Sequence, residues 1–444
     1  MDAREVALLT LNACERQGGW SDGVLKKQIA AAGLDSRDAG LATQLCFGVI
    51  QNRILLDFYL SKFSNIPLRR LEGKVLQALR LGLYQMLFLT RIPHSAAVDQ
   101  SVALTRAHCK NPRAPGMVNA ILRNLERSLD RLPTIPEDDP AEYYATLYSH
   151  PVWLVRELLE TLGSEGTAAF LQADNSQPPI TAMVNTVKTD LEGALEALQA
   201  EGVHGEPHPW LKNCLVLSRS GSLEELDAFQ NGLFYVQDPA SRLAVLALDP
   251  EPGDRVLDMC AAPGGKSFAA AIQMRDQGEI WSCDLHPHKK TLIQKGAQRL
   301  GLTCIRPQTA DGKVRRPEWE GAFDRVLVDA PCSGLGVIRK KPDIRFKDPE
   351  PLAGLPQVQS AILDNAAGYV KPGGVLVYST CTILERENRA VTDAFLAAHP
   401  EFRRESFLLP GPAGEVSGGQ ITLWPQVHGT DGFYICKLRK DGEA

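Results

Sequence analysis

The sequence predicts a multidomain protein of the α + α/β class: an N-terminal helical bundle, a small α/β middle domain and a C-terminal domain built on a parallel sheet. Three observations support this prediction. Its 444 residues exceed one typical core. A proline-rich acidic stretch interrupts the chain near residue 135, and from about residue 238 short apolar runs alternate with helical patterns.

Residues 1–132 contain apolar side chains at helical spacing. Val75, Leu79, Leu83 and Met86 recur at steps of four, four and three, which places them on one face of a helix that Pro93 limits. A helical bundle is therefore expected for this first domain.

Residues 133–140 contain three prolines and three acids without apolar periodicity, which is typical of a stiff linker. Beyond it, residues 180–187, 214–217 and 233–236 are predicted strands, and residues 191–200 a predicted helix. We expect a small α/β domain of ferredoxin-like type over residues 141–237.

The C-terminal domain, residues 238–444, is predicted from strict alternation of strands and helices. The expected strands are 255–260, 280–284, 304–307, 325–329 and 375–379. Short apolar runs separated by helices indicate a parallel sheet covered on both faces. Ligands of such sheets bind at the carboxyl ends of the strands, so the chemistry is expected there.

Composition limits the function classes. The hydrophobic fraction of 44%, the charged fraction of 23% and the net charge of -5 are ordinary for a soluble globular protein. Ten cysteines occur singly, without a Cys-x-x-Cys pair or a His cluster, so neither a disulfide framework nor a metal is expected. Without an apolar leader or an apolar run of membrane-spanning length, we expect a cytoplasmic protein with no membrane partner, and a monomer.

Residues 60–131 form a locally basic region in this acidic chain. They contain twelve Lys or Arg (Lys62, Arg69, Arg70, Lys74, Arg80, Arg91, Arg106, Lys110, Arg113, Arg123, Arg127, Arg131) against four acids. Such an excess is either a solvated helix face or a nucleic-acid-binding surface.

A candidate cofactor turn follows the first strand of the C-terminal domain. It runs from an acid through small residues into a helix: Asp258, Met259, Cys260, Ala261, Ala262, Pro263, Gly264, Gly265, Lys266. The two glycines permit a tight turn and close approach of a ligand to the backbone. Lys266 is either a contact of the ligand or a surface residue.

Two further acids stand at neighbouring strand ends. Asp284 closes the second strand, where such folds place a carboxylate that binds ribose hydroxyls, and Asp311 follows the third, where it would meet an adenine amino group. The turn lacks the longer glycine pattern of dinucleotide sites, and an acid-rich pocket suits a positive sulfonium. The predicted cofactor is therefore S-adenosylmethionine, with Asp258 and the backbone of residues 261–265 at its methionine end. Cys260, Lys266 and Asp329 are further candidate cofactor-binding residues.

Cys332 and Cys381 fall just past the fourth and fifth strands, in Asp329-Ala-Pro-Cys-Ser-Gly and Ser379-Thr-Cys-Thr. C5 of cytosine is a poor nucleophile, and a thiolate that adds at C6 turns C5 into an enamine carbon able to accept a methyl group. Two cysteines beside a nucleoside pocket therefore predict cytosine-5 methylation. The residues alone leave open which thiol attacks.

The two cysteine motifs and the 258–266 turn resemble the signatures of the RNA cytosine-5 methyltransferase family. Further agreement comes from Gln237–Ser241, Lys371–Gly374, Glu385 with Glu387 and Asn388, and His428–Phe433, while residues 92–98 and 117–125 resemble the NusB-like RNA-binding domain. The combination resembles the bacterial Sun/Fmu (RsmB) type, which modifies small-subunit (16S) ribosomal RNA.

The resemblance assigns roles to single residues. Cys381 adds to C6, Asp329 bonds or protonates N3, and Cys332 assists removal of the C5 proton and release of the enzyme. Lys341 and Arg345 belong to a stretch that resembles one lining the RNA path, or that forms a charged loop. The partner implied is 16S RNA with a single-stranded or opened cytosine.

Two alternatives remain open at this point. A DNA cytosine-5 methyltransferase would use Cys332, which follows a proline, as nucleophile. A non-catalytic RNA-binding ribosome assembly factor would use the NusB-like part alone. Our main hypothesis divides the work: basic helices bind RNA, the middle domain positions it, and the C-terminal sheet carries the reaction.

Overall fold

The computed structural model describes residues 1–17, 20–218 and 221–442. These form two compact units. The helical unit comprises Met1–Ser176 with Ile338–Lys347, and the α/β unit comprises Gln177–Val337 with Asp348–Ala444. No helix in the described ranges is long and apolar enough to cross a membrane.

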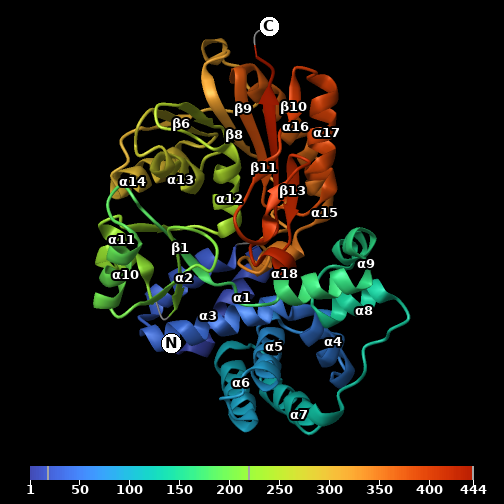
Figure 1. The fold of residues 1–444 in the computed structure, drawn as a ribbon. Helices are drawn as coiled ribbons and strands as arrows, with labels where there is room; N and C mark the ends of the chain where they lie inside the picture. Colours follow the sequence, from blue (N-terminus) through green and yellow to red (C-terminus); the bar gives the residue numbers. More distant parts are fainter. Residues whose placement is uncertain (18–19, 219–220, 443–444) are drawn as a thin grey trace. The chain divides into compact units, whose positions relative to one another are not determined.

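The helical unit is a bundle around one central helix. Its helices are α1 Ala3–Gln17, α2 Ser21–Ala32, α3 Ser36–Gln51, α4 Arg53–Phe63, α5 Gly73–Phe88, α6 His94–His108, α7 Ala114–Glu126, α8 Pro140–Leu147 and α9 Val152–Asp174. Helix α5 contacts α1, α3, α4, α6 and α7 (Figure 1). The predicted bundle is confirmed.

Helix α5 is buried on all sides rather than on one face. The predicted face is buried, and so are the residues between, including the polar Arg80 at 4% exposure. Arg80 forms ion pairs with Asp57 at 2.7 Å and Glu15 at 3.2 Å. A central helix surrounded by others has no solvent face, which explains why charge appears inside it.

Most of the basic residues between 60 and 131 lie at the surface. Arg80 is internal, and Arg123 bonds Asp99 and Glu126. Nine others are exposed: Lys62, Arg69, Arg70, Arg91, Arg106, Lys110, Arg113, Arg127 and Arg131. The surface contributed by residues 60–131 is therefore basic.

The segment 338–347, which follows the Cys332 motif in sequence, packs inside the helical unit. Arg345 is 1% exposed, and its guanidinium donates to the carbonyl oxygens of Gln51 at 2.6 Å and Ser149 at 3.0 Å. It also donates to Asn175 Oδ1 at 3.1 Å. Neither alternative for Arg345 holds, because both of its Nη atoms are bonded inside the helical unit and the side chain does not reach solvent, although its buried Nε has no hydrogen-bond partner among the described residues. Lys341, by contrast, is exposed.

Replacing Arg345 by Met is expected to destabilise the helical unit by about 3 kcal/mol, because three buried acceptors lose their donor. Thermal unfolding of the full chain, with proteolysis of segment 338–347, measures this. Lys341→Met, on the same segment, should stay within about 0.5 kcal/mol of the parent. Equal stability of the two variants would contradict the anchoring role.

The α/β unit contains a small antiparallel sheet. Its strands are β1 Ile180–Val184, β2 His204–Pro207, β3 Cys214–Ser218 and β4 Phe234–Val236, in the order β2-β3-β1-β4, with α10 Leu191–Ala200 and α11 Asp227–Gln230. The predicted strands and helix are present within a few residues. Strand β2 was not predicted, because its residues have no apolar alternation.

The large sheet has the order β10-β14-β9-β8-β5-β6-β7, with β13 paired to β14. Its strands are β5 Arg255–Asp258, β6 Glu279–Asp284, β7 Ile305–Thr309, β8 Phe323–Asp329, β9 Val370–Thr380, β10 Phe402–Arg404, β13 Gln420–Leu423 and β14 Phe433–Lys440. Strands β5 to β9 are parallel, as predicted, whereas β14 is antiparallel to β9. The sheet is therefore mixed, and the C-terminal strands were missed.

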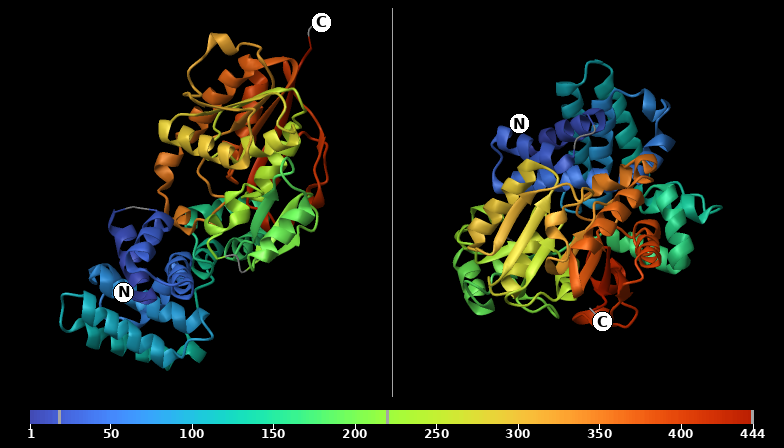
Figure 2. Two further views of the ribbon diagram at one scale, coloured as in Figure 1. Left: turned by 90° about the vertical axis from the view of Figure 1, so that its left-hand side faces the viewer. Right: turned by 90° about the horizontal axis from the view of Figure 1, so that it is seen from above.

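Both faces of the large sheet are covered by helices, as Figure 2 shows in yellow to red. The helices are α12 Pro239–Leu248, α13 Gly265–Gln273, α14 Pro287–Leu300, α16 Leu355–Tyr369 and α17 Arg389–Ala398. On β9, Val375 and Val377 pack with α12 and α13, while Leu376 and Tyr378 pack with α16 and α17. Alternate residues thus enter different cores, so the strand is apolar throughout.

The two units do not coincide with the predicted domain limits, which remain predictions. Helices α8 and α9 belong to the helical unit, where α8 contacts α4. The small sheet belongs to the α/β unit, where buried Asn185 donates to the carbonyl oxygens of Gly232 at 2.9 Å and Leu300 at 2.8 Å. The contacts of each segment, rather than its composition, decide this grouping.

Candidate active site

The predicted cofactor turn connects β5 to α13 and borders a pocket of about 200 Å³. Gly264 has φ 115°, and a Cβ there would lie 2.4 Å from the Phe268 ring, so a side chain is excluded. The Ala262-Pro263 peptide bond is cis. The pocket is lined by Val236, Gln237, Asp238, Ser241, Asp258, Cys260, Ala261, Ala262, Pro263, Gly265, Lys266 and Asp329.

Asp258 is the buried acid of this pocket. Its Oδ2 accepts from Ser267 Oγ at 2.7 Å, while its buried Oδ1 has no hydrogen-bond partner. Burial raises the pKa of Asp258 to about 7, against the opposing bond from Ser267. A buried carboxylate oxygen without a donor, facing a pocket, suits a ligand that brings a positive charge or an N–H group.

Asp284 and Asp311 lie at the same edge of the sheet but outside the lining of this pocket. Asp284 is 6% exposed at the end of β6 and accepts from the His286 backbone N–H at 3.3 Å. Asp311 follows β7 and accepts from the Lys313 N–H at 2.9 Å. Their contact with a nucleoside remains a prediction.

Cys332 and Cys381 meet at the carboxyl ends of β8 and β9. Their sulfur atoms are 3.3 Å apart, and both residues are half-buried. The hydrogen bond with Cys381, together with burial, raises the pKa of Cys332 well above its usual value. Either thiol of this pair can be the donor.

Glu387, which is fully buried, holds the two cysteine loops together. Its Oε2 accepts from the Ser333 N–H and from Gln359 Nε2, both at 2.9 Å. Ser333 Oγ in turn bonds Thr382 Oγ1 at 2.7 Å, so the residues that follow each cysteine are joined. The cysteine positions are therefore set by a buried polar network.

A close glycine contact completes the Cys332 loop. The Gly336 N–H donates to the Cys381 carbonyl at 3.0 Å, and the Gly432 N–H donates to the Gly336 carbonyl at 2.8 Å. A Cβ at Gly336 would lie 1.8 Å from the Gly432 carbonyl oxygen. Only glycine fits at position 336. A Cβ at Gly432 would in turn lie 2.8 Å from the Gly336 Cα, which explains the glycine in the motif around residue 432.

Lys266 is a site residue and not a surface residue. Its Nζ lies 2.7 Å from Asp329 Oδ2, and the ammonium interacts electrostatically with Cys381. Burial lowers the pKa of Lys266, but the charge of Asp329 outweighs it, so the pKa is raised. Asp329 Oδ1 accepts from Ser379 Oγ at 2.9 Å, which fixes its carboxylate beside the cysteines.

The structure thus brings together Asp258, residues 260–266, Asp329, Cys332 and Cys381. Sequence reasoning missed Glu387, Ser333, Gln359 and Ser379 as supports of the site. The Glu387-Asn388 pair was visible as part of the family resemblance, but its bond to the Cys332 loop, 54 residues earlier at Ser333, was not predictable from local sequence. Among the described residues, no group of three or more His, Cys, Asp or Glu is arranged to hold a metal ion.

Asp258→Asn is expected to change the pH dependence of stability. Its unfolded pKa is about 4 and its folded pKa about 7, so the parent loses stability as pH rises from about 4 to about 7, by about 4 kcal/mol in total. The Asn variant lacks this loss. Urea unfolding at several pH values measures the difference, which should favour the variant more at pH 8 than at pH 4. Parallel curves would contradict it.

Comparisons with known proteins agree with this architecture. Three family models match: 16S rRNA methyltransferase RsmB/F over residues 245–439, the NusB family over 1–127, and the ferredoxin-like domain of RsmF/B-like methyltransferases over 150–224. They confirm the predicted fold class.

Curated relatives extend the match along the chain. One is named "Probable ribosomal RNA small subunit methyltransferase B", from Bacillus subtilis (strain 168), and is 40% identical over 99% of both chains. Ribosomal RNA small subunit methyltransferase B of Klebsiella pneumoniae subsp. pneumoniae is 34% identical over 92% of this chain and 91% of its own.

Among solved structures, that of PH0851 is 26% identical with a TM-score of 0.80, over 99% of both chains. A methyltransferase homolog protein from Pyrococcus horikoshii is 28% identical with a TM-score of 0.56, over 67% of this chain and 97% of its own. With full-length identity of 40%, the NusB match and the geometry above, the chain belongs to the RsmB/F family of 16S rRNA methyltransferases.

Proposed function

We propose that the protein methylates C5 of one cytosine in 16S ribosomal RNA, with S-adenosylmethionine as methyl donor and Cys381 as nucleophile. The observation that carries this proposal is the Cys332–Cys381 pair, 3.3 Å apart beside Asp329. Methyl transfer to nitrogen or oxygen needs no thiol, whereas C5 of cytosine needs a nucleophile at C6.

The 200 Å³ pocket fits the methionine end of S-adenosylmethionine. Asp258 Oδ1 is a buried acceptor without a donor, and the glycine turn excludes side chains that would fill the approach. Asp258 and the backbone of residues 261–265 would hold that end, with Asp284 and Asp311 directed to the nucleoside. When bound, the cofactor supplies an electrophilic methyl group.

Cys381 adds to C6 through its thiolate. Cys332 lies 3.3 Å away, and a hydrogen bond donated by its S–H would favour the negative charge on the Cys381 sulfur. The electron pair of the C5–C6 double bond moves into the ring toward N3 as the C6–S bond forms. The Lys266–Asp329 pair supplies a proton at N3, so the ring charge is neutralised where it builds.

Cys332 acts after C5 has gained its methyl group. Cys332 first releases its own proton to solvent, and its thiolate then accepts the C5 proton. The C5–C6 double bond re-forms, N3 returns its proton to the Lys266–Asp329 pair, and the C6–S bond breaks with its electron pair on Cys381. The proton that Cys332 released is the one proton that methylation of cytosine sets free. Release of free Cys381 completes the cycle.

The RNA partner is supported by the surface of the helical unit. Nine exposed Lys and Arg between residues 62 and 131 would contact phosphates, which provides affinity without reading sequence. The target cytosine must be unstacked before a half-buried thiol reaches C6. We therefore infer a single-stranded or opened cytosine as the substrate.

The test is methylation of 16S RNA that lacks the modification, with labelled S-adenosylmethionine, followed by mapping of the product base. The expected product is 5-methylcytosine at one position. Labelling of another atom or base, or no labelling of either naked 16S RNA or small-subunit particles, would refute the proposal.

A further inference from the structure

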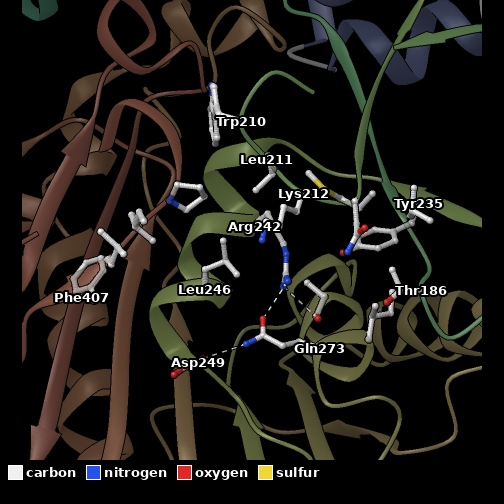
Figure 3. Close-up of a pocket in the computed structure, with 18 of the residues that line it drawn as sticks. Thr186, Trp210, Leu211, Lys212, Tyr235, Arg242, Leu246, Asp249, Gln273 and Phe407 are labelled. Carbon is white, nitrogen blue, oxygen red and sulfur yellow. Dashed lines mark hydrogen bonds between the residues drawn. The ribbon is translucent and has the colours of Figure 1, made fainter. Parts of the chain in front are cut away.

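A second cavity, of about 800 Å³, lies in the α/β unit beside α12 and α13 (Figure 3). Its walls come from the small sheet, from α12 and α13, and from the β11 strand Phe407–Leu408. No residue lines both cavities. Helix α12 contributes to both linings: Ser241 borders the cofactor pocket, and the next residue, Arg242, borders this cavity.

Arg242 is a positively charged residue in the lining of this cavity. Its Nη1 donates to the Ala269 carbonyl at 3.3 Å and its Nη2 to Gln273 Oε1 at 3.0 Å, and Figure 3 shows these bonds. The Gln273 side-chain amide also donates a hydrogen bond of 3.4 Å to the carboxylate of the exposed Asp249. Both direct partners are neutral, and no ion pair of Arg242 is found within the described ranges.

The charge of Arg242 is partly buried, and both of its hydrogen-bond acceptors are neutral. Desolvation lowers the pKa of its guanidinium, and the groups that oppose this shift are Tyr235 and Cys214, both uncharged at neutral pH. Arginine nevertheless stays protonated in proteins. A partly desolvated cation with neutral partners costs free energy that a bound anion would recover.

Three further cations among the described residues line the cavity, and two of them add positive charge to that of Arg242. Lys212 and Arg275 are exposed at its rim, and Lys437 is neutralised by Glu405 at 3.0 Å. The acid among the lining residues is Asp249, which is exposed. The field inside the cavity is therefore positive, and strongest near Arg242.

The other walls are apolar. They include Leu211, Tyr235, Leu246, Ile272 and Phe407, with Trp210 beside them (Figure 3). A cavity of this volume holds a drug-sized molecule, and apolar walls with a few charged or polar groups are typical of sites for small organic ligands.

We propose that this cavity binds a small organic anion with an aromatic or aliphatic body, whose acidic group pairs with Arg242 and whose body packs against Leu246 and Ile272. The site is distinct from the methyl-transfer site and stands independently of the proposed reaction. Helix α12 contributes residues to both cavities, so a ligand bound here would contact the helix that also lines the cofactor pocket.

The experiment uses 8-anilinonaphthalene-1-sulfonate as probe, an aromatic sulfonate whose fluorescence rises in apolar surroundings, with the full-length chain. Its neutral analogue N-phenyl-1-naphthylamine is the second probe. Saturable binding of the sulfonate is expected. Arg242→Met should weaken it by about 10- to 100-fold, while binding of the neutral analogue stays unchanged.

The control is Arg403→Met, an exposed arginine on β10, which should bind both probes like the parent. Leu246→Trp, which fills the cavity, should lose both probes, and it carries the test if Arg242→Met unfolds. Undiminished sulfonate binding in either cavity variant, or the absence of saturable binding in the parent, would overturn the proposal. Methylation activity enters none of these readouts.

Discussion

Cys381→Ala is expected to abolish covalent capture of RNA that carries 5-fluorocytosine, and to lower the methylation rate by at least about 1,000-fold, or about 4 kcal/mol of activation free energy. Without the thiolate nothing adds to C6, and C5 stays a poor nucleophile. Fluorine at C5 cannot leave as a proton, so the parent enzyme stays attached to this RNA after methyl transfer. Denaturing gel electrophoresis of the labelled adduct measures the loss.

Cys332→Ala should behave in the opposite way. It retains Cys381, so the adduct with 5-fluorocytosine RNA still forms, and with ordinary RNA an adduct should accumulate because the C5 proton is removed slowly. Turnover is expected to fall by about 100-fold. A capture that depends on Cys332 instead would assign the nucleophile to the other thiol, as in the DNA-methyltransferase alternative.

Cys283→Ala is the matched cysteine control. Burial raises the pKa of Cys283 to about 12, so it is a protonated thiol close to the sheet edge but outside the cysteine pair. It should form the adduct like the parent. Loss of adduct in this variant would show that capture reports general damage to the site.

Asp329→Asn is expected to lower kcat by about 100- to 10,000-fold with a smaller change in KM. The amide keeps the shape but neither pairs with Lys266 nor carries a proton to N3. Single-turnover methylation measures the chemical step, and calorimetry with S-adenosylhomocysteine reports whether the cofactor pocket is intact.

Lys266→Met tests whether the two residues act together. Since Lys266 acts through Asp329, the double variant should be little slower than Asp329→Asn alone. Additive losses would show that Lys266 serves the reaction separately, and an unchanged kcat in Asp329→Asn would remove Asp329 from the mechanism. A drop in cofactor affinity without a change in kcat would assign the pair to binding.

Much of the architecture followed from local patterns. Short apolar runs that alternate with helices predicted the parallel strands β5 to β9, because strands buried on both faces are apolar throughout. The carboxyl ends of these strands indicated where the site is expected. Strands β2 and β14 escaped prediction. The first is exposed and polar, and the second is antiparallel and follows a long irregular stretch.

Arg345 shows where local reading fails. In sequence it belongs to a charged run after the Cys332 motif, and such a run is usually solvated. Its partners Gln51, Ser149 and Asn175 are more than 150 residues away, so no window of sequence contains the reason for its burial. Arg242 escaped notice for the same reason, since its cavity is assembled from seven stretches of the chain between residues 183 and 437.

The sequence by itself predicted which residues carry the chemistry: the Asp258–Lys266 turn, Asp329, Cys332 and Cys381, each at or just past the end of a strand. Only the tertiary structure decided how they act on one another. It brought the two sulfurs to 3.3 Å, turned Lys266 from an ambiguous residue into the partner of Asp329, and left Asp258 Oδ1 without a donor. Strand periodicity is a local property, whereas electrostatic and hydrogen-bonding environment depends on distances between segments that meet only when the chain folds.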